Sequence, residues 1–234
     1  PRGFAVIGEN EALDYLDTLP VARIWGVGKA LHRKLVSDGL QTIGQLRIQD
    51  EAQLVKRYGA IGQRLARFSR GEDHRRVKPH SGPKSLSNEN TFFEDIGDRE
   101  ILAQRLWPLC EKVTDRIKAR DLAGRTVTIK LKSSTFKTLT RSQALPTPTQ
   151  LAETLFRAAI PLLDRAVDAA PAGSKFRLIG VGLSNFTDPL EADPPDLADP
   201  DFYHRKRVEA VIDQVRSKLG NDAIVKGRTI PKRK

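Results

Sequence analysis

Apolar and polar residues alternate strictly between residues 125 and 132, and this is the clearest pattern in the chain. The apolar positions are Val127, Ile129 and Leu131, and the polar ones are Thr126, Thr128, Lys130 and Lys132. A period of two residues is typical of a β-strand with one buried face. We therefore predict a strand here whose other face is polar and basic.

The segment before this strand predicts a shorter strand and a helix. Residues 91–93 fit a strand, and Asp98 is placed to cap the helix that follows. The helix has an apolar stripe at helical spacing, formed by Leu102, Leu106, Leu109, Val113 and Ile117. Pro108 falls inside the stripe and should kink the helix.

The segment after residue 132 predicts the second half of the same domain. Residues 136–145 fit a hairpin partner strand, and residues 147–150 fit a capping box with a proline at the first helical position. The second helix should run to about residue 169, again with a disruptive proline, Pro161. Residues 176–184 fit a closing strand. The order strand, helix, strand, strand, helix, strand predicts a split βαβ, ferredoxin-like domain with both helices on one sheet face.

Residues 11–73 show a different pattern, with short helical stretches separated by glycines. Their apolar anchors are Leu31, Leu35, Leu46, Leu54, Leu65 and Phe68. This pattern predicts a compact all-α unit. Residues 74–84 form a basic linker, residues 187–201 are rich in Pro, Asp and Glu, and one more helix should end at Gly220.

The net charge of the chain indicates the kind of partner that it binds. The chain carries a formal net charge of +11 with a pI near 9.9, and 39% of its residues are hydrophobic, enough for real cores. Such a field attracts polyanions, so nucleic acid is the expected partner. No apolar run approaches the roughly 20 residues that cross a bilayer, so we expect a cytoplasmic protein without a membrane partner. The chain begins at Pro1 and contains no methionine, so we expect a fragment.

Candidate catalytic and metal groups are missing from this pattern. Cys110 lies among apolar residues at helical spacing, so core packing is its expected role. None of His32, His74, His80 and His204 has metal-ligand spacing to another His, Cys or carboxylate. We therefore expect no catalytic residue, cofactor site or metal site in this chain.

The segment Gly26-Val27-Gly28-Lys29 has the layout of a helix-hairpin-helix turn. Glycine permits the tight turn, and the N–H groups of Val27, Gly28 and Lys29 should point outward at a helix start, where the dipole favours a phosphate. Arg33 on the same helix favours that function, and a purely structural interhelical turn is the alternative. Residues 58–62 fit a second, degenerate hairpin or a simple helix connection equally well.

The polar face of the predicted sheet is the second candidate. Thr128, Lys130 and Lys132 share it, and Lys137, Arg141 and Arg177 could join them from neighbouring strands. We favour a phosphate-binding surface over simple solvation because the positive charge needs a partner. Phe136 could pack the hairpin or touch a sugar, and we favour packing. The triplet at residues 180–182 should mark close packing within a strand.

These residues resemble the Y-family translesion DNA polymerases of bacteria. Resemblance to the thumb domain lies in Leu19-Pro20-Val21, Ile24, Gly26-Val27-Gly28, Lys34-Leu35, Gly39, Arg57-Tyr58-Gly59, Gly62, Leu65, Gly71-Glu72-Asp73 and Val77. Resemblance to the linker and little finger lies in Lys84-Ser85, Thr91-Phe92, Thr126 to Lys132, Phe136, Thr140-Arg141-Ser142 and Leu178 to Ser184. It covers about residues 16–186 in the correct order.

The resemblance implies a polymerase whose thumb holds the minor groove of primer–template DNA and whose little finger lies beside the major groove. In that family the catalytic carboxylates, which hold two magnesium ions, lie in a palm domain before the thumb. Residues 1–17 carry none of them. Family members also bind the sliding clamp through a motif near the C-terminus, and residues 195–199 lie there without its usual glutamine.

Together these observations predict an α+β chain with five parts. They are the end of a palm at 1–17, a helix-hairpin-helix thumb at 18–75, a basic linker at 76–87, a ferredoxin-like little finger at 88–188 and a tail with one helix at 189–234. The expected function is the DNA-binding part of an error-prone translesion polymerase, inactive alone because its Mg²⁺ centre lies in the palm. A non-catalytic DNA-repair accessory protein is the alternative. The expected DNA-binding residues are Gly26, Val27, Gly28, Lys29, Arg33, Lys84, Lys130, Lys132, Lys137, Arg141, Ser142 and Arg177.

Overall fold

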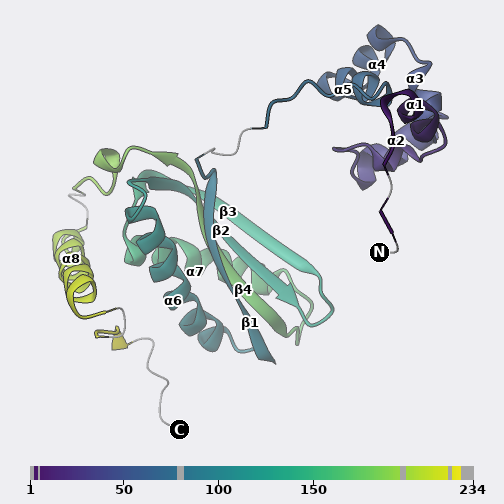
Figure 1. The fold of residues 1–234 in the computed structure, drawn as a ribbon. Helices are drawn as coiled ribbons and strands as arrows, with labels where there is room; N and C mark the ends of the chain where they lie inside the picture. Colours follow the sequence, from purple (N-terminus) through teal and green to yellow (C-terminus); the bar gives the residue numbers. More distant parts are fainter. Residues whose placement is uncertain (1–2, 5, 78–81, 196–198, 221–222, 228–234) are drawn as a thin grey trace. The chain divides into compact units, whose positions relative to one another are not determined.

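The computed structural model describes residues 3–4, 6–77, 82–195, 199–220 and 223–227. The chain divides into two compact units, Pro1–His80 and Ser81–Lys234. Both are shown in Figure 1.

The first unit is all-α, as predicted. Its helices are α1 (Glu9–Asp17), the 3₁₀ turn η1 (Val21–Arg23), α2 (Lys29–Ser37), α3 (Ile43–Arg47), α4 (Glu51–Tyr58) and α5 (Ala60–Ser69). Its core contains four of the predicted anchors in fully buried form, Leu35, Leu46, Leu54 and Leu65, with Leu31 and Phe68 packed partly against them. Short helices of this kind are stable only through such packing.

Glycines set the closest contact in this unit. Gly59 ends α4 and caps α5 with a φ of +68°, a conformation that L side chains rarely adopt. Gly62 packs directly on α4, because a Cβ there would lie 2.1 Å from the Leu54 carbonyl oxygen. The two helices can therefore approach at their backbones.

The second unit is built on an antiparallel sheet of four strands in the order β1-β4-β2-β3. The strands are β1 (Ser85–Ile96), β2 (Ala123–Ser133), β3 (Thr138–Thr149) and β4 (Phe176–Thr187). Helices α6 (Arg99–Lys118) and α7 (Ala152–Asp168) lie together on one face of the sheet (Figure 1). This confirms the predicted α+β fold class and its order of elements, and each helix connects two strands that are separated by one other strand.

Side-chain periodicity explains this packing. Val127, Ile129 and Leu131 on β2 are fully buried beneath the helices, and the predicted stripe of α6 lies in the same core with Cys110. Asp98 caps α6 by accepting a hydrogen bond from the Ile101 N–H at 3.0 Å. Both helices continue through their prolines, Pro108 and Pro161.

The predicted capping box at residues 147–150 is wrong. Pro148 and Thr149 belong to β3, and α7 begins only at Ala152. Thr147, the expected N-cap residue, also lies within β3, and the Thr149 hydroxyl donates to Asp193 Oδ1 at 2.6 Å and accepts from the Leu151 N–H at 3.0 Å. Asp193, expected to be a loop charge, is buried, and this burial raises its pKa.

The tail contains a second 3₁₀ turn, η2 (Pro189–Glu191), and the helix α8 (Phe202–Leu219). Phe202 and Ile212 are buried, so α8 packs on the unit through an apolar side. Arg216 of α8 also pairs with Glu111 of α6 at 2.9 Å. The tail helix is therefore part of the second unit (Figure 1).

Candidate nucleic-acid interface

The glycine hairpin lies between η1 and α2. Gly26 has a φ of +95°, which only glycine adopts readily, and Gly28 is the N-cap residue of α2 with an extended backbone. The Val27 N–H donates to Ile24 O at 3.1 Å and the Gly28 N–H to Gly26 O at 3.2 Å. Two of the three amides that we expected to face a phosphate are thus engaged within the turn.

The first turn of α2 supplies the remaining donors. The first hydrogen bond along the helix runs from the His32 N–H to Gly28 O at 2.9 Å. The amides of Lys29, Ala30 and Leu31 precede it and have no partner within the helix, as at any helix start. Lys29 is exposed at this end, so its charge adds to the positive end of the helix dipole. Arg33 is also exposed, one turn further on.

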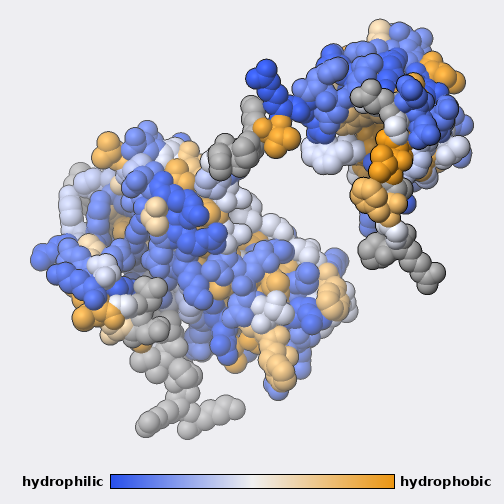
Figure 2. Space-filling view, viewed as in Figure 1, coloured by the Kyte–Doolittle hydropathy of each residue, from blue (hydrophilic) through white to orange (hydrophobic). Residues whose placement is uncertain are grey.

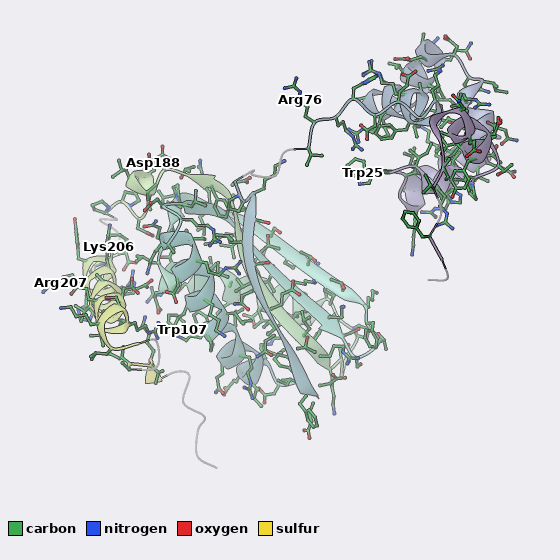
Figure 3. All side chains as sticks on the ribbon, viewed as in Figure 1. Trp25, Arg76, Trp107, Asp188, Lys206 and Arg207 are labelled. Atoms are coloured by element: carbon green, nitrogen blue, oxygen red, sulfur yellow. The ribbon has the colours of Figure 1, made fainter. Side chains whose placement is uncertain are left out.

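The turn at residues 58–62, which joins α4 to α5, lies beside the hairpin at residues 26–28. A Cβ built on Gly26 would be 3.7 Å from both Ile61 and Arg64 of α5. The Arg64 guanidinium also lies over the Trp25 ring, 5.4 Å from its centroid. Trp25 itself is 64% exposed and projects from the unit (Figure 3). The N-terminal part of α5 therefore borders the α2 hairpin.

Arg75 joins the same cluster, although it was not among the residues expected to form the interface. Its guanidinium lies 4.6 Å from the Trp25 ring centroid and 4.7 Å from that of Phe68. Asp73 accepts two hydrogen bonds from it, at 2.8 and 2.7 Å, and this lowers the pKa of Asp73 to about 2. The only sequence signal was an aromatic residue beside a glycine turn in an arginine-rich unit.

The open face of the sheet carries polar side chains, as predicted. Lys130 of β2 lies opposite Thr140 of β3 and Gly180 of β4. Thr128 lies opposite Ser142, and their hydroxyl oxygens are 2.9 Å apart. These residues share the face because directly paired residues point to the same side.

Lys130 is neutralised across this face. Its ammonium group lies 3.0 and 3.1 Å from the carboxylate oxygens of Glu89 on β1. The pair spans Gly180, where a Cβ would lie 2.7 Å from Glu89 Cγ. The predicted close packing at residues 180–182 is confirmed. A groove of about 240 Å³ lies over Gly180 and Gly182, which have no side chains to fill it.

Arg141 was wrongly expected on this face. The register pairs Arg141 with Ile129, whose side chain is fully buried beneath the helices. Gln143, two residues further along β3, accepts a hydrogen bond from Arg165 of α7. Arg141 therefore lies on the helix side of the edge strand. The buried side of β3 is marked in the sequence only by Leu139 and Leu145, because the positions between them on that side, Arg141 and Gln143, are polar.

The turn between β2 and β3 gathers several other predicted residues. Phe136, for which we favoured packing on the hairpin, is 64% exposed and lies outside the core. The Arg177 guanidinium lies 4.1 Å from its ring centroid, and Lys132 Nζ lies 6.0 Å away. Lys137 is exposed in the same turn. The structure thus brings two of the predicted cations to an aromatic ring, with the third, Lys137, in the same turn.

The predicted cations differ in their electrostatic surroundings. Within the described ranges, Lys130 has an acidic partner, whereas Lys29, Arg33, Lys132, Lys137 and Arg177 have none within 4.0 Å. Lys84 is exposed immediately before β1 and is likewise unpaired there. Figure 2 shows that hydrophilic residues cover most of the visible surface of each unit. These unpaired charges are the ones available to a polyanion.

Two other expectations concern metals and membranes. In the described part of the chain, no group of three or more His, Cys, Asp or Glu side chains is placed to hold a metal ion. Among the same residues, no helix combines the length and the apolar character that a membrane span requires. Residues 196–198, at the centre of the expected clamp motif, lie outside the described residues.

Comparisons with known proteins agree with this architecture. The model of the impB/mucB/samB family C-terminal domain matches residues 83–197. DNA polymerase IV from Brucella melitensis and DNA polymerase IV 1 from Mesorhizobium japonicum are each 48% identical and align over 99% and 98% of this chain. The alignments cover 51% of each relative, so the chain spans about half the length of these proteins.

A solved structure supports the fold. The Y-family DNA polymerase chimera Dbh-Dpo4(243-245)-Dbh is similar with a TM-score of 0.63 and 20% identity, covering 80% of this chain and 53% of that chain.

An all-α unit with a glycine hairpin and an open-faced α+β unit, both rich in unpaired cations, define a basic protein with surfaces suited to phosphate. The chain belongs to the Y family of DNA polymerases, and the relatives named above are its DNA polymerase IV members.

Proposed function

We propose that this chain is the DNA-gripping part of a translesion DNA polymerase and that it binds primer–template DNA through the sugar–phosphate backbone. In this proposal the first unit is the thumb and the sheet unit is the little finger. The observation that carries it is the exposed start of α2, where Gly28, Lys29 and the first-turn amides coincide. Such contacts position DNA without reading its sequence.

Catalysis in the parent protein belongs to the same proposal. The nucleotidyl-transfer chemistry would require carboxylates and two magnesium ions in a palm domain that precedes the thumb. The residues described here would hold the DNA in position for that chemistry. Binding of the sliding clamp near residues 195–199 stays a prediction.

Gly28 offers a test that separates binding from folding. A Cβ at this position meets no atom within 4 Å, and its backbone is extended, so other residues fit there. Gly28→Asn places a strong N-cap side chain on the first-turn amides, where it competes with a phosphate. We expect unchanged or higher stability and DNA affinity that is weaker by about tenfold, as for the loss of a charged hydrogen bond.

The matched control is Gly39→Asn, beyond the other end of α2. Gly39 has a φ of +82°, which asparagine tolerates better than most residues, and nothing lies within 4 Å of its Cβ position. Anisotropy titrations of a labelled primer–template should show unchanged affinity for this variant. If Gly28→Asn is folded and binds as tightly as Gly39→Asn, the hairpin does not contact DNA.

A further inference from the structure

The tip of the β2–β3 hairpin holds an aromatic side chain outside the core. Phe136 has a φ of +64°, which is disfavoured for a bulky residue, and its side chain is 64% exposed. Residues in such conformations persist where the surrounding structure imposes them, and they often mark functional positions. Neither a turn preference nor core packing accounts for phenylalanine here.

Hydrogen bonds fix the turn that presents the ring. The Phe136 N–H donates to Ser133 O at 2.9 Å, and the Ser133 N–H donates to Lys137 O at 2.9 Å. The Ser134 N–H donates to Lys175 O at 3.0 Å, which ties the turn to the residues just before β4. The backbone that carries the ring is therefore held in place before any ligand arrives.

Cations surround this ring. Arg177 covers it at 4.1 Å from the centroid, and Lys132 lies further off at 6.0 Å. Lys137 and Lys175 are exposed in the adjoining segments. Within the described ranges none of these has an acidic partner, in contrast to Lys130 further along the same strand, which is paired with Glu89. Positive charge and an accessible ring thus coincide at the hairpin tip.

We propose that this hairpin tip is a binding site for single-stranded DNA, in which an unpaired nucleobase stacks on Phe136. The cations at Lys132 and Arg177 would hold the adjoining phosphates. Exposed aromatic rings among cations bind single strands because every base has a face to stack. Bases inside a duplex are already stacked on one another, so along its length a duplex offers the ring no such partner. The inference rests on the proposed DNA-binding function and names a DNA form that this part of it recognises.

Phe136→Asn is the main test variant because it keeps the turn and removes the ring. Asparagine tolerates a positive φ, so the thermal midpoint should stay the same or rise. Binding of an oligothymidylate should weaken at least about fivefold, the lower end for losing one stacked base. Binding of a blunt duplex should change by less than about twofold. Phe136→Tyr keeps the ring and should bind the oligothymidylate as the parent chain does.

The outcomes separate this inference from the proposed function. If the parent chain binds neither the oligothymidylate nor the duplex, the proposed function itself fails. If the parent binds both and Phe136→Asn binds the oligothymidylate equally well, only the stacking site is wrong. An equal loss of both ligands would place the ring against the backbone and would also overturn the inference. A lower thermal midpoint without a loss of binding would make Phe136 a structural residue.

A second measurement does not depend on removing the ring. Phe136→Trp places a fluorescent ring at the site, and its signal is the difference from the parent chain, which contains Trp25 and Trp107. A stacked base should quench this emission when the oligothymidylate saturates the protein, and a blunt duplex should quench it much less. Saturation without a change in the difference signal would contradict stacking.

Discussion

Glu209 on the tail helix α8 caps the N-terminus of α7. Its two carboxylate oxygens accept hydrogen bonds from the Ala152 N–H at 2.8 and 3.1 Å. The same carboxylate pairs with Lys118 of α6 at 2.9 Å, and Glu209 is only 5% exposed. One buried side chain therefore connects three helices, and it satisfies a donor that α7 leaves unpaired at its start.

Removing this carboxylate should destabilise the second unit. Glu209→Ala leaves the Ala152 N–H without its acceptor and takes from the Lys118 ammonium one of its two carboxylate partners, so we expect a loss of about 3 kcal/mol in the free energy of unfolding. Denaturant titration followed by circular dichroism measures it. Asp213→Asn is the matched control, because Asp213 shares Lys118 but is 37% exposed at its side chain and caps no helix. Equal losses in the two variants would contradict the capping role.

This cap is an example of a contact that local sequence patterns could not predict. The alternation in residues 125–132 and the stripe of α6 were sufficient to predict β2, α6 and the buried face of the sheet, because each pattern is local. The cap of α7 comes from a residue 57 positions away along the chain. A capping box was predicted at residues 147–150 because a threonine and a proline there have the right spacing. Instead, β3 continues through Thr147, and the side chain of Gln150, the last residue of the expected box, donates to the distant Leu122 O at 2.8 Å.

In the candidate interface, too, local patterns predicted some residues, whereas others depend on contacts between distant segments. Glycine spacing located the hairpin at residues 26–28, since tight turns need glycine wherever they occur. Arg141 was misplaced because strand register decides its face, and only Leu139 and Leu145 mark the buried face of this edge strand. The pairing of Lys130 with Glu89 and the stacking of Arg75 on Trp25 join distant segments, so no local pattern could reveal them.

The Lys130–Glu89 pair predicts how DNA binding responds to charge. In the proposed DNA-binding role, Glu89→Gln releases Lys130 for a phosphate and removes a negative charge from the same face. Affinity should rise severalfold, and the slope of log affinity against log salt should steepen by about one unit per new phosphate contact. Anisotropy titrations over a range of salt concentrations measure both quantities.

Glu94→Gln is the control for this prediction. It removes the same charge from the exposed part of β1, and Glu94 has no ion pair within the described ranges. Its effect should be a small rise in affinity without a change in slope. If the two variants behave alike, Lys130 makes no phosphate contact of its own.

The α4–α5 corner predicts a large effect from a small substitution. Alanine normally stabilises a helix relative to glycine by about 1 kcal/mol. Gly62→Ala should instead destabilise the first unit by about 3 kcal/mol, because the new Cβ would lie 2.1 Å from the Leu54 carbonyl oxygen, which cannot move alone. Gly28→Ala, with open space around its Cβ position, should cost less than about 1 kcal/mol as an N-cap change. A stabilised Gly62→Ala variant would show that the helices do not touch there.

Tyr58 gives a prediction for alkaline pH. Burial, together with the hydrogen bond that its hydroxyl donates to Asp38 at 2.5 Å, raises its pKa from 10.0 to about 12. A raised folded pKa means that the phenol contributes stability below about pH 10, and that this contribution is lost as the pH rises towards about 12. Phenolate absorbance should therefore show a group that ionises late and an accompanying loss of stability in the first unit. Tyr58→Phe should remove both and lower the free energy of unfolding at neutral pH by about 1 kcal/mol.

Tyr15→Phe, at a position 52% exposed, should leave the late ionisation and the neutral stability unchanged. If the late ionisation persists in Tyr58→Phe, the hydrogen bond to Asp38 does not control it.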